Sequence, residues 1–157
     1  MSGFILNELL DKLSKRDAGA TRFGGSLELR VATADAKKRM VVYEYEVTEE
    51  EIFRGYLDSG WLSTVVDNAT DPLIRATTAS PATSFTSSLT VHTLEPVLPG
   101  TRLEIVCRLV LVEGRLLQST VAFRDAQRRN VVYATGVLTL VYKDAAALLG
   151  AGGGAKL

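Results

Sequence analysis

The sequence predicts an α+β domain in which one long apolar helix is wrapped by a six-stranded antiparallel sheet. Residues 58–70 carry apolar side chains at the three- and four-residue spacing of a buried helix. Two segments with the pattern of sheet strands precede this helix, and four follow it. A helix this apolar has to be covered, and six antiparallel strands provide a sheet that can wrap around it.

One helix and two strands are predicted before the central helix. An apolar stripe near the N-terminus indicates a helix that packs on the domain or on a neighbouring subunit, and its mixed charges make a membrane-surface helix the weaker interpretation. Gly24 and Gly25 open a strand over residues 27–31, and residues 35–38 form a polar turn. A second strand covers residues 41–47, and residues 48–51 are an acidic, solvated lead-in to the central helix. The stripe consists of Phe4, Ile5, Leu6, Leu9, Leu10 and Leu13.

The central helix is predicted to begin at Asp58, a good N-cap residue that is followed by two small residues. The segment Thr70-Asp71-Pro72 should end or kink it, because proline lacks a backbone donor. Asp67 lies among the apolar positions of this helix, and a buried carboxylate is costly unless it is hydrogen-bonded or used chemically. The helix pattern alone favours a structural role for Asp67 over a catalytic one.

Four strands are predicted after the helix, separated by a loop and three turns. A loop rich in threonine, serine and proline covers residues 77–83, and the strands cover residues 85–94, 102–112, 115–123 and 131–142. Turns fall at residues 98–100, 113–114 and 125–130. Residues 1–144 thus form one domain, and the Ala/Gly-rich residues 145–157 form a flexible tail.

Composition excludes several classes of function. The chain of 157 residues has 18 Lys+Arg and 18 Asp+Glu, so its formal net charge is zero, which argues against a nucleic-acid surface. The single cysteine, Cys107, allows no internal disulfide, and one histidine with one cysteine leaves no His/Cys zinc site. No apolar run is long enough to span a membrane, and charged residues break up the N-terminal apolar region, unlike in a signal peptide. We expect neither a metal nor a cofactor.

Taken together, several short motifs resemble the hotdog-fold acyl-CoA thioesterases, in particular the phenylacetate-degradation and thioesterase-superfamily-member enzymes. The resemblance covers residues 46–142, and the order and spacing of the motifs carry it. It implies that the sheet described above has the hotdog architecture. It also implies hydrolysis of a fatty or aromatic acyl-CoA to the free acid and CoA. The motifs are Gly55-Tyr56-Leu57, Val65-Val66-Asp67-Asn68, residues 86–91, Pro96, Gly100, Gly114-Arg115 and Ala134-Thr135-Gly136.

The resemblance also assigns roles to particular residues. The oxyanion donors would be the backbone N–H groups of Ser59 and Gly60, where the free donors at a helix start stabilise negative charge. Asp67 would be the catalytic carboxylate, and Thr86 the hydroxyl that orients the water. In this family the carboxylate serves a site shared with the facing subunit, so a homodimer or homotetramer is implied. The CoA-contacting positions would be Thr86, Ser88, Pro96, Gly114 and Arg115.

The chain departs from the family pattern at two positions. Asp58 stands where the family commonly has histidine, and Ile52 or Phe53 stands where it often has asparagine or glutamine. An anion at Asp58 would oppose an oxyanion formed nearby unless it acts only as an N-cap turned away from the substrate. A hotdog protein that binds acyl-CoA without hydrolysing it is therefore the alternative function.

Four further side chains are candidates of lower rank. His92 lies beside hydroxyl residues on a strand face and is more readily a packed or surface residue than a catalytic one. Arg115 is as readily a solvated hairpin charge as a phosphate ligand. Arg54 and Arg75 flank the central helix and are weaker phosphate candidates.

The last three residues, Ala155-Lys156-Leu157, are a close variant of the Ser-Lys-Leu peroxisomal address. An import receptor could bind this tripeptide after the Gly-rich spacer. The expected location is therefore the peroxisome or a related organelle such as the glycosome, with the cytoplasm as the alternative.

Changing Lys156→Glu, or deleting Leu157, should move a tagged protein from that organelle to the cytosol. The fold should stay unaltered, because the spacer is expected to make few contacts. Fluorescence imaging of the N-terminally tagged variants tests this expectation, and unchanged organelle localisation would show that the tripeptide is not the address.

Overall fold

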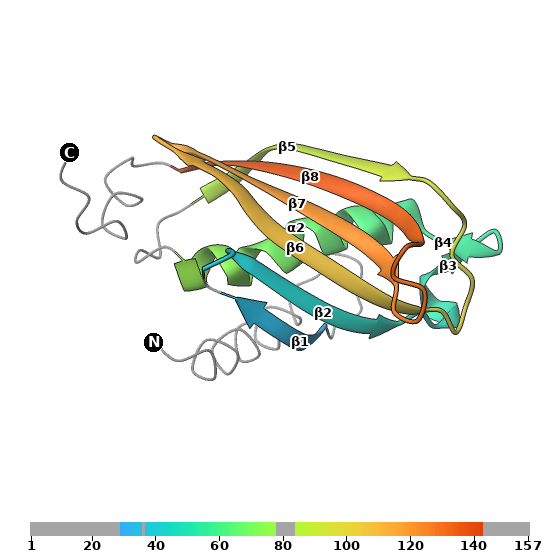
Figure 1. Ribbon diagram of the computed structural model, residues 1–157. Helices are drawn as coiled ribbons and strands as arrows, with labels where there is room; N and C mark the ends of the chain where they lie inside the picture. The colour runs from blue at the N-terminus through green and yellow to red at the C-terminus, as the bar shows by residue number, and fades with distance from the viewer. Residues whose placement is uncertain (1–28, 36, 78–83, 143–157) are drawn as a thin grey trace.

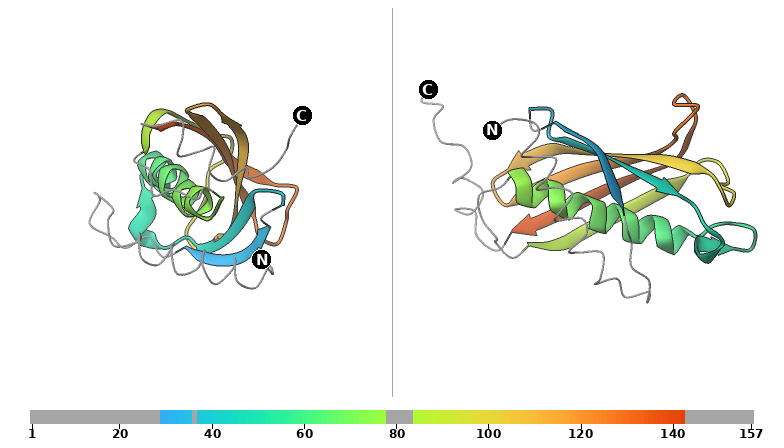
Figure 2. Two further views of the ribbon diagram at one scale, coloured as in Figure 1. Left: turned by 90° about the vertical axis from the view of Figure 1, so that its left-hand side faces the viewer. Right: turned by 90° about the horizontal axis from the view of Figure 1, so that it is seen from below.

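The computed structural model describes residues 29–35, 37–77 and 84–142. In this part of the chain, one long helix lies against a six-stranded antiparallel sheet (Figure 1). Viewed from the end of the molecule, the sheet curves around the helix (Figure 2). The α+β architecture predicted from the sequence is confirmed. No helix among these residues is long and apolar enough to cross a membrane.

The six strands follow the order β1-β2-β6-β7-β8-β5, with every neighbouring pair antiparallel. Two further strands of two residues each form a separate hairpin, and a single turn of 3-10 helix precedes this hairpin. Strands β1 and β5 are the edges of the large sheet, so one side of each has no partner strand in the described part of the chain. The elements are β1 (Arg30–Asp35), β2 (Met40–Glu46), η2 (Glu49–Glu51), β3 (Ile52–Phe53), β4 (Tyr56–Leu57), α2 (Ser59–Thr77), β5 (Ser84–Thr93), β6 (Arg102–Glu113), β7 (Leu116–Asp125) and β8 (Val132–Tyr142).

The first strand differs from the prediction, whereas the other five begin and end within about two residues of their predicted bounds. Strand β1 covers residues 30–35 rather than 27–31, and the turn after it lies at residues 37–39. A bulge between Val31 and Thr33 shifts the register, and this interrupts the period-two pattern that reveals a strand. The predicted N-terminal helix, most of the loop at residues 77–83 and the tail at residues 145–157 lie outside the described residues.

The sequence predicts that residues 70–72 end or kink the helix; α2 continues through Pro72 to Thr77, so the first of these alternatives is wrong. A proline inside a helix deprives the carbonyl four residues earlier, here that of Asn68, of its helical donor. A hydroxyl from the sheet binds the next carbonyl, because Tyr43 Oη donates to the Ala69 oxygen over 2.9 Å. Tyr43 thus joins β2 to the helix turn that the proline weakens.

A buried pair of hydroxyls makes a second polar contact between helix and sheet. Thr70 Oγ1 donates to the Val66 carbonyl over 3.0 Å and lies 3.0 Å from Ser119 Oγ on β7. A hydroxyl has one hydrogen, so Ser119 is the donor in the second bond. Both side chains are fully buried, and their mutual bonds satisfy the polar groups in an otherwise apolar interface.

The core fills the space between α2 and the sheet. The apolar positions of the helix that the sequence predicts are buried at Leu62, Val65, Val66 and Ala69, whereas Trp61 is half-buried. Helix and sheet approach closely at Gly136 of β8, where an added Cβ would lie 2.4 Å from Val66 Cγ2. The fully buried large side chains also include Tyr43, Leu73, Ile74, Leu103, Ile105, Leu117, Phe123, Leu138 and Tyr142.

Cys107 is fully buried on β6, and burial raises the pKa of its thiol. Both properties suppress reaction, because the thiolate is the nucleophile and the reagent has to reach it. The thiol should therefore react with an aromatic disulfide reagent only as the domain opens, and at once in guanidinium chloride. Absorbance of the released thiolate measures both rates, and rapid reaction in plain buffer would contradict this packing.

The β7–β8 turn is held by the carboxylate of Asp125. Its Oδ1 accepts the backbone N–H groups of Gln127 (2.9 Å) and Arg128 (2.8 Å). Its Oδ2 accepts Tyr133 Oη (2.8 Å) and the Arg128 guanidinium (3.0 Å from Nη2). The backbone bond from Arg128 and the hydroxyl bond from Tyr133 hold the pKa of Asp125 well below its ordinary value.

The stability that Asp125 contributes should be complete above the ordinary aspartate pKa of about 4, and should be lost as the pH falls towards the lowered pKa. Asp125→Asn should therefore unfold at a lower temperature than wild type at pH 7. The difference in melting temperature should shrink as the pH is lowered below about 4. Melting curves across this range test the assignment, and a difference that does not change with pH would contradict it.

Candidate active site

The helix N-terminus is built around Asp58, which caps it as the sequence predicts. Asp58 Oδ1 accepts the backbone N–H of Trp61 (3.0 Å), and the Asp58 carbonyl accepts that of Leu62 (3.1 Å). The Asp58 N–H in turn donates to the Glu51 carbonyl over 2.9 Å. The carboxylate is therefore bonded to the helix and sits beside its positive end.

The first two N–H groups of α2 belong to Ser59 and Gly60, the predicted oxyanion donors. No acceptor in the described part of the chain binds either group, as is expected in the first turn of a helix. A Cβ on Gly60 would lie 2.8 Å from Asp58 Oδ1, so a side chain at this position would displace the capping carboxylate. The local structure therefore presents two backbone donors with an anion next to them.

Glu51 supports the same region, and the sequence analysis did not single out its role. Its carboxylate accepts Tyr45 Oη (2.7 Å), the Thr48 N–H (2.7 Å) and Thr48 Oγ1 (2.9 Å). The pattern Thr-x-x-Glu at residues 48–51 is the signature of a capping box and could have revealed these bonds. Tyr45 also packs against Trp61, with ring centroids 5.0 Å apart, so strand β2 is tied to the helix start.

Asp67 and Thr86 are brought together by the fold. Thr86 Oγ1 on the edge strand β5 donates to Asp67 Oδ1 over 2.8 Å. Both residues are exposed in the single chain, so the prediction that Asp67 is a buried carboxylate is wrong. The reason lies in the position of β5 at the sheet edge. Asp67 lies on the side of α2 next to the edge strand β5, whereas Val65, Val66 and Ala69 face the core.

The predicted donors and the predicted carboxylate do not meet within one chain. Gly60 and Asp67 are seven residues apart on α2, which places them on one face but about 10 Å apart along the axis. A carbonyl carbon that is attacked at Asp67 cannot have its oxygen at Gly60 over this distance. The single chain therefore contains two half-sites, and we call them the donor half (Ser59 and Gly60) and the carboxylate half (Asp67 and Thr86).

The structure does not bring the predicted CoA-contacting residues together within one chain. Pro96 is exposed in the loop after β5, and the Leu57 N–H donates to the Val97 carbonyl (3.0 Å), so this loop lies beside the donor half. Ser88 is exposed on β5 close to Thr86, and a register shift separates the two residues. The shift places Thr86 opposite the buried Leu140 and Ser88 opposite Thr139, on the other face of the sheet, so Ser88 does not join the carboxylate half.

Gly114 and Arg115 form the β6–β7 turn at the end of the sheet where β5 begins. Gly114 has a φ of 56°, as a tight two-residue hairpin turn requires. Arg115 Nε donates to the Tyr142 carbonyl over 2.7 Å, and Tyr142 lies opposite Ser84, the first residue of β5. The remaining guanidinium nitrogens make no ion pair with the described residues, so the side chain is fixed at one end and exposed at the other.

The other candidate side chains make no bond to either half in the described part of the chain. His92 is exposed on β5, and its neighbour Val91 pairs with Gly136, which faces the helix; His92 therefore points to the opposite face of the sheet. Arg54 lies over the Phe53 ring, 5.2 Å from its centroid, and the side chain of Arg75 lies outside the described part. Among the described residues, no group of histidine, cysteine and carboxylate side chains could hold a metal ion.

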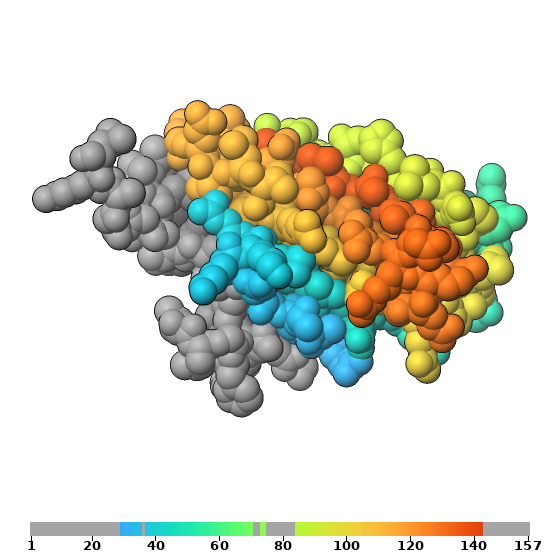
Figure 3. Space-filling view, in the orientation of Figure 1, coloured from blue at the N-terminus to red at the C-terminus, as the bar shows by residue number. Residues whose placement is uncertain are grey.

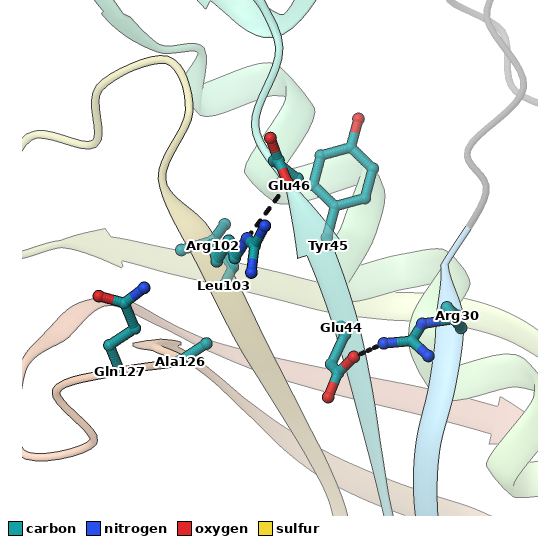
Figure 4. Close-up of a pocket in the computed structure, with 8 residues that line it drawn as sticks. All are labelled: Arg30, Glu44, Tyr45, Glu46, Arg102, Leu103, Ala126 and Gln127. Atoms are coloured by element: carbon teal, nitrogen blue, oxygen red, sulfur yellow. Dashed lines mark hydrogen bonds and ion pairs between the residues drawn. The ribbon is translucent and has the colours of Figure 1, made fainter.

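A hollow of about 520 Å³ lies elsewhere, between the ends of β1, β2 and β6 and the β7–β8 turn (Figure 4). Arg30 pairs with Glu44 there, and Arg102 Nε lies 3.3 Å from Glu46 Oε2. The two arginines are thus balanced by two glutamates, and none of the predicted site residues lines the hollow. Its lining residues are Arg30, Glu44, Tyr45, Glu46, Arg102, Leu103, Ala126 and Gln127.

Comparison with known proteins finds similar solved structures, and these agree with one another in their fold. No protein-family model and no curated protein matches the sequence. The structure of mouse thioesterase superfamily member 2 has a TM-score of 0.73 and 19% identity over 90% of this chain and 98% of its own. A phenylacetic acid degradation-related protein from Ralstonia eutropha JMP134 has a TM-score of 0.68 and 19% identity over 85% of this chain and 98% of its own.

This chain has the hotdog fold. A third similar structure, from Streptococcus mutans UA159, is bound to acetyl CoA; its TM-score is 0.65, with 16% identity over 74% of this chain and 89% of its own. The mouse and Ralstonia structures belong to the thioesterase groups that the sequence resembles, so the predicted fold is confirmed. At these identities the likeness establishes the fold, and the chemistry has to be argued from the two half-sites.

Proposed function

We propose that the protein is an acyl-CoA thioesterase that hydrolyses a fatty or aromatic acyl-CoA to the free acid and CoA. The observation that carries this proposal is the bond between Asp67 and Thr86 at the exposed edge of the hotdog sheet. A carboxylate held by a hydroxyl, within reach of solvent, suits the activation of water or direct attack on a thioester. A related fold that binds acetyl CoA supports the choice of ligand.

The two half-sites supply the parts of thioester hydrolysis from different subunits. Pairing of β5 with β5 of a second copy would satisfy the unpaired edge and continue the sheet. Antiparallel pairing sets the start of one β5 against the end of the other. The carboxylate half of one subunit then approaches the donor half of its partner, and the active unit is a homodimer or a dimer of dimers.

Each group has a distinct task in this dimer. The N–H groups of Ser59 and Gly60 bind the oxyanion that forms on the thioester oxygen. Asp67 removes a proton from water or attacks the carbonyl carbon, and Thr86 orients the water and the carboxylate. Charge on Asp58 opposes the oxyanion, although its bond to the Trp61 N–H spreads part of that charge into the helix.

The same pairing of β5 strands brings Pro96 of one subunit towards Arg115 of the other. Pro96 and Arg115 lie at opposite ends of β5, which spans roughly 30 Å, so one chain cannot hold CoA with both. In an antiparallel dimer, Pro96 of one subunit approaches Arg115 of the other. The exposed guanidinium of Arg115 is suited to a CoA phosphate.

Thiol release from a panel of acyl-CoAs tests the proposal. Purified protein is mixed with short-chain, long-chain and aromatic acyl-CoAs, and free CoA is measured with a thiol reagent. The buried Cys107 should not contribute to the signal. We expect turnover with at least one class and sedimentation as a dimer or tetramer at micromolar concentration. A stable monomer would contradict the shared site.

The second candidate is a hotdog protein that binds acyl-CoA without hydrolysing it. The observation that favours it is the Asp58 carboxylate, which lies against Gly60 at the donor half. Saturable acyl-CoA binding without thiol release, across the whole panel, would decide for this alternative.

A further inference from the structure

The tip of the β6–β7 hairpin exposes a cluster of large aliphatic side chains. Val110 is 52% exposed, Leu116 44%, and Leu111 and Val112 37% each, and we call these four residues the tip cluster. The hairpin projects beyond the neighbouring strands at one end of the sheet (Figures 1 and 3). Exposed apolar side chains on a projecting element are typical of a surface that binds another protein or a membrane.

Cations surround this end of the sheet. The β1–β2 turn places Lys37, Lys38 and Arg39 on the surface, all exposed. The Leu109 N–H donates to the Arg39 carbonyl over 2.9 Å, so the turn lies against β6 one residue before Val110. The turn that carries these three exposed cations therefore lies beside the start of the tip cluster.

Two arginines complete what we call the basic cluster, which consists of Lys37, Lys38, Arg39, Arg108 and Arg115. Arg108 is exposed on β6 just before the tip, and Arg115 is in the turn itself. The same segments contribute two carboxylates, Asp35 and Glu113, and Asp35 is bonded to Lys38. The region thus has an excess of positive charge, although the whole chain has a formal net charge of zero.

We propose that the tip cluster and the basic cluster together dock the protein on an anionic lipid bilayer. The four aliphatic side chains would enter the boundary between headgroups and acyl chains, while the cations would bind the negatively charged headgroups. A bilayer is the partner that offers an apolar layer directly beneath a negative surface. A second copy of the chain fits less well, because two identical tips in contact would bring two basic clusters together.

The docking surface is distinct from the two half-sites. Apart from Arg115, which is also proposed to bind a CoA phosphate, none of its residues has a role in the proposed hydrolysis. If the proposed function holds, docking would place the enzyme where long-chain acyl-CoA, an amphiphile, collects at a membrane. Docking itself does not depend on turnover. Asp67→Asn should therefore bind vesicles as wild type does, and the two proposals can fail independently.

Vesicle sedimentation tests the proposal on the full-length protein. Phosphatidylcholine vesicles with and without phosphatidylserine are mixed with the protein, and the bound fraction is measured at low and high salt. We expect binding to the phosphatidylserine vesicles, much weaker binding to pure phosphatidylcholine, and loss of binding at high salt. Lys37→Gln should weaken binding about fivefold, the effect of one cation near an anionic surface. Val110→Ser should weaken it by about the same factor, because less apolar area is buried.

Two substitutions far from the tip serve as matched controls. Leu98→Ser removes an aliphatic side chain that is 55% exposed in the loop before β6, and Arg54→Gln removes an exposed cation of the β3–β4 hairpin. Both should leave vesicle binding unchanged. Melting curves confirm that each variant is folded, and Lys37→Gln, in an exposed turn, keeps the test valid if Val110→Ser is unstable.

Three results would overturn the proposal. The first is absence of binding to phosphatidylserine vesicles, or equal binding to both kinds of vesicle. The second is full binding by both Lys37→Gln and Val110→Ser. The third is a smaller assembly of Val110→Ser in sedimentation velocity with lipid binding unchanged, which would identify the tip as a contact between subunits.

Discussion

Asp67→Asn should lower turnover of acyl-CoA by a factor on the order of a hundred or more, the effect of losing a positioned base. The amide keeps the shape of the carboxylate and can still accept the bond from Thr86 Oγ1, so the local structure should persist. Acyl-CoA binding should also persist, because the donor half and the CoA contacts hold the thioester. Stopped-flow or steady-state thiol release, together with direct binding of acyl-CoA, measures the two quantities on one preparation.

A melting curve on the same preparation separates catalysis from structure. Asp67 is exposed, so its neutralisation should change the melting temperature little. A variant that melts early but turns over normally per folded molecule would show that Asp67 is only structural.

Asp58→Asn is the matched control on the other carboxylate of α2. Asparagine is an equally good N-cap and can accept the Trp61 N–H, so the helix start should survive. Activity should stay unchanged or rise, because a negative charge beside the oxyanion donors is removed. Loss of activity in Asp58→Asn with full activity in Asp67→Asn would mean that Asp58 is the catalytic carboxylate.

The sequence predicts the fold well because the signals for it are local. The spacing of Leu62, Val65 and Val66 defines the buried face of the helix, and the alternation along β2 defines its wet and dry faces. Both patterns report only whether neighbouring side chains share an environment. They do not reveal which strand lies at the sheet edge, and this is why Asp67 is expected in the core and is found beside the edge strand β5.

The predicted end of α2 is wrong for a related reason. The cost of Pro72 is local, whereas the hydroxyl that binds the neighbouring helix carbonyl comes from Tyr43, 26 residues from Ala69 in the chain. Contacts across such distances cannot be inferred from a helix pattern. The same holds for the bond between Asp67 and Thr86: the family resemblance gives each residue a role, but no spacing rule predicts that they are bonded to each other.

Gly136→Ala should lower the free energy of unfolding by about 2 to 3 kcal/mol, the usual cost of forcing a methyl group into a packed core. On an ordinary strand this substitution would favour folding, because alanine has less backbone freedom to lose than glycine. Here the new Cβ would lie 2.4 Å from Val66 Cγ2 and 3.1 Å from Val66 Cγ1, so helix and sheet would have to separate. The melting temperature should fall by roughly 4–10 °C.

Thr135→Ala, one residue earlier on β8 and on the other face of the strand, is the control and should change stability by less than about 1 kcal/mol. The decisive variant is the double substitution with Val66→Ala, which removes both methyl groups that the new Cβ would meet. Val66→Ala alone should cost about 2 kcal/mol by leaving a cavity against Gly136. The added methyl group fills that cavity, so the double variant should be more stable than the sum of the single effects predicts, by about 1 to 3 kcal/mol. Denaturant melts of the wild type, Gly136→Ala, Val66→Ala and the double variant measure this coupling. Strict additivity would mean that the helix does not rest on β8 at Gly136, and the height of α2 above the sheet, on which the position of Asp67 depends, would then be set elsewhere.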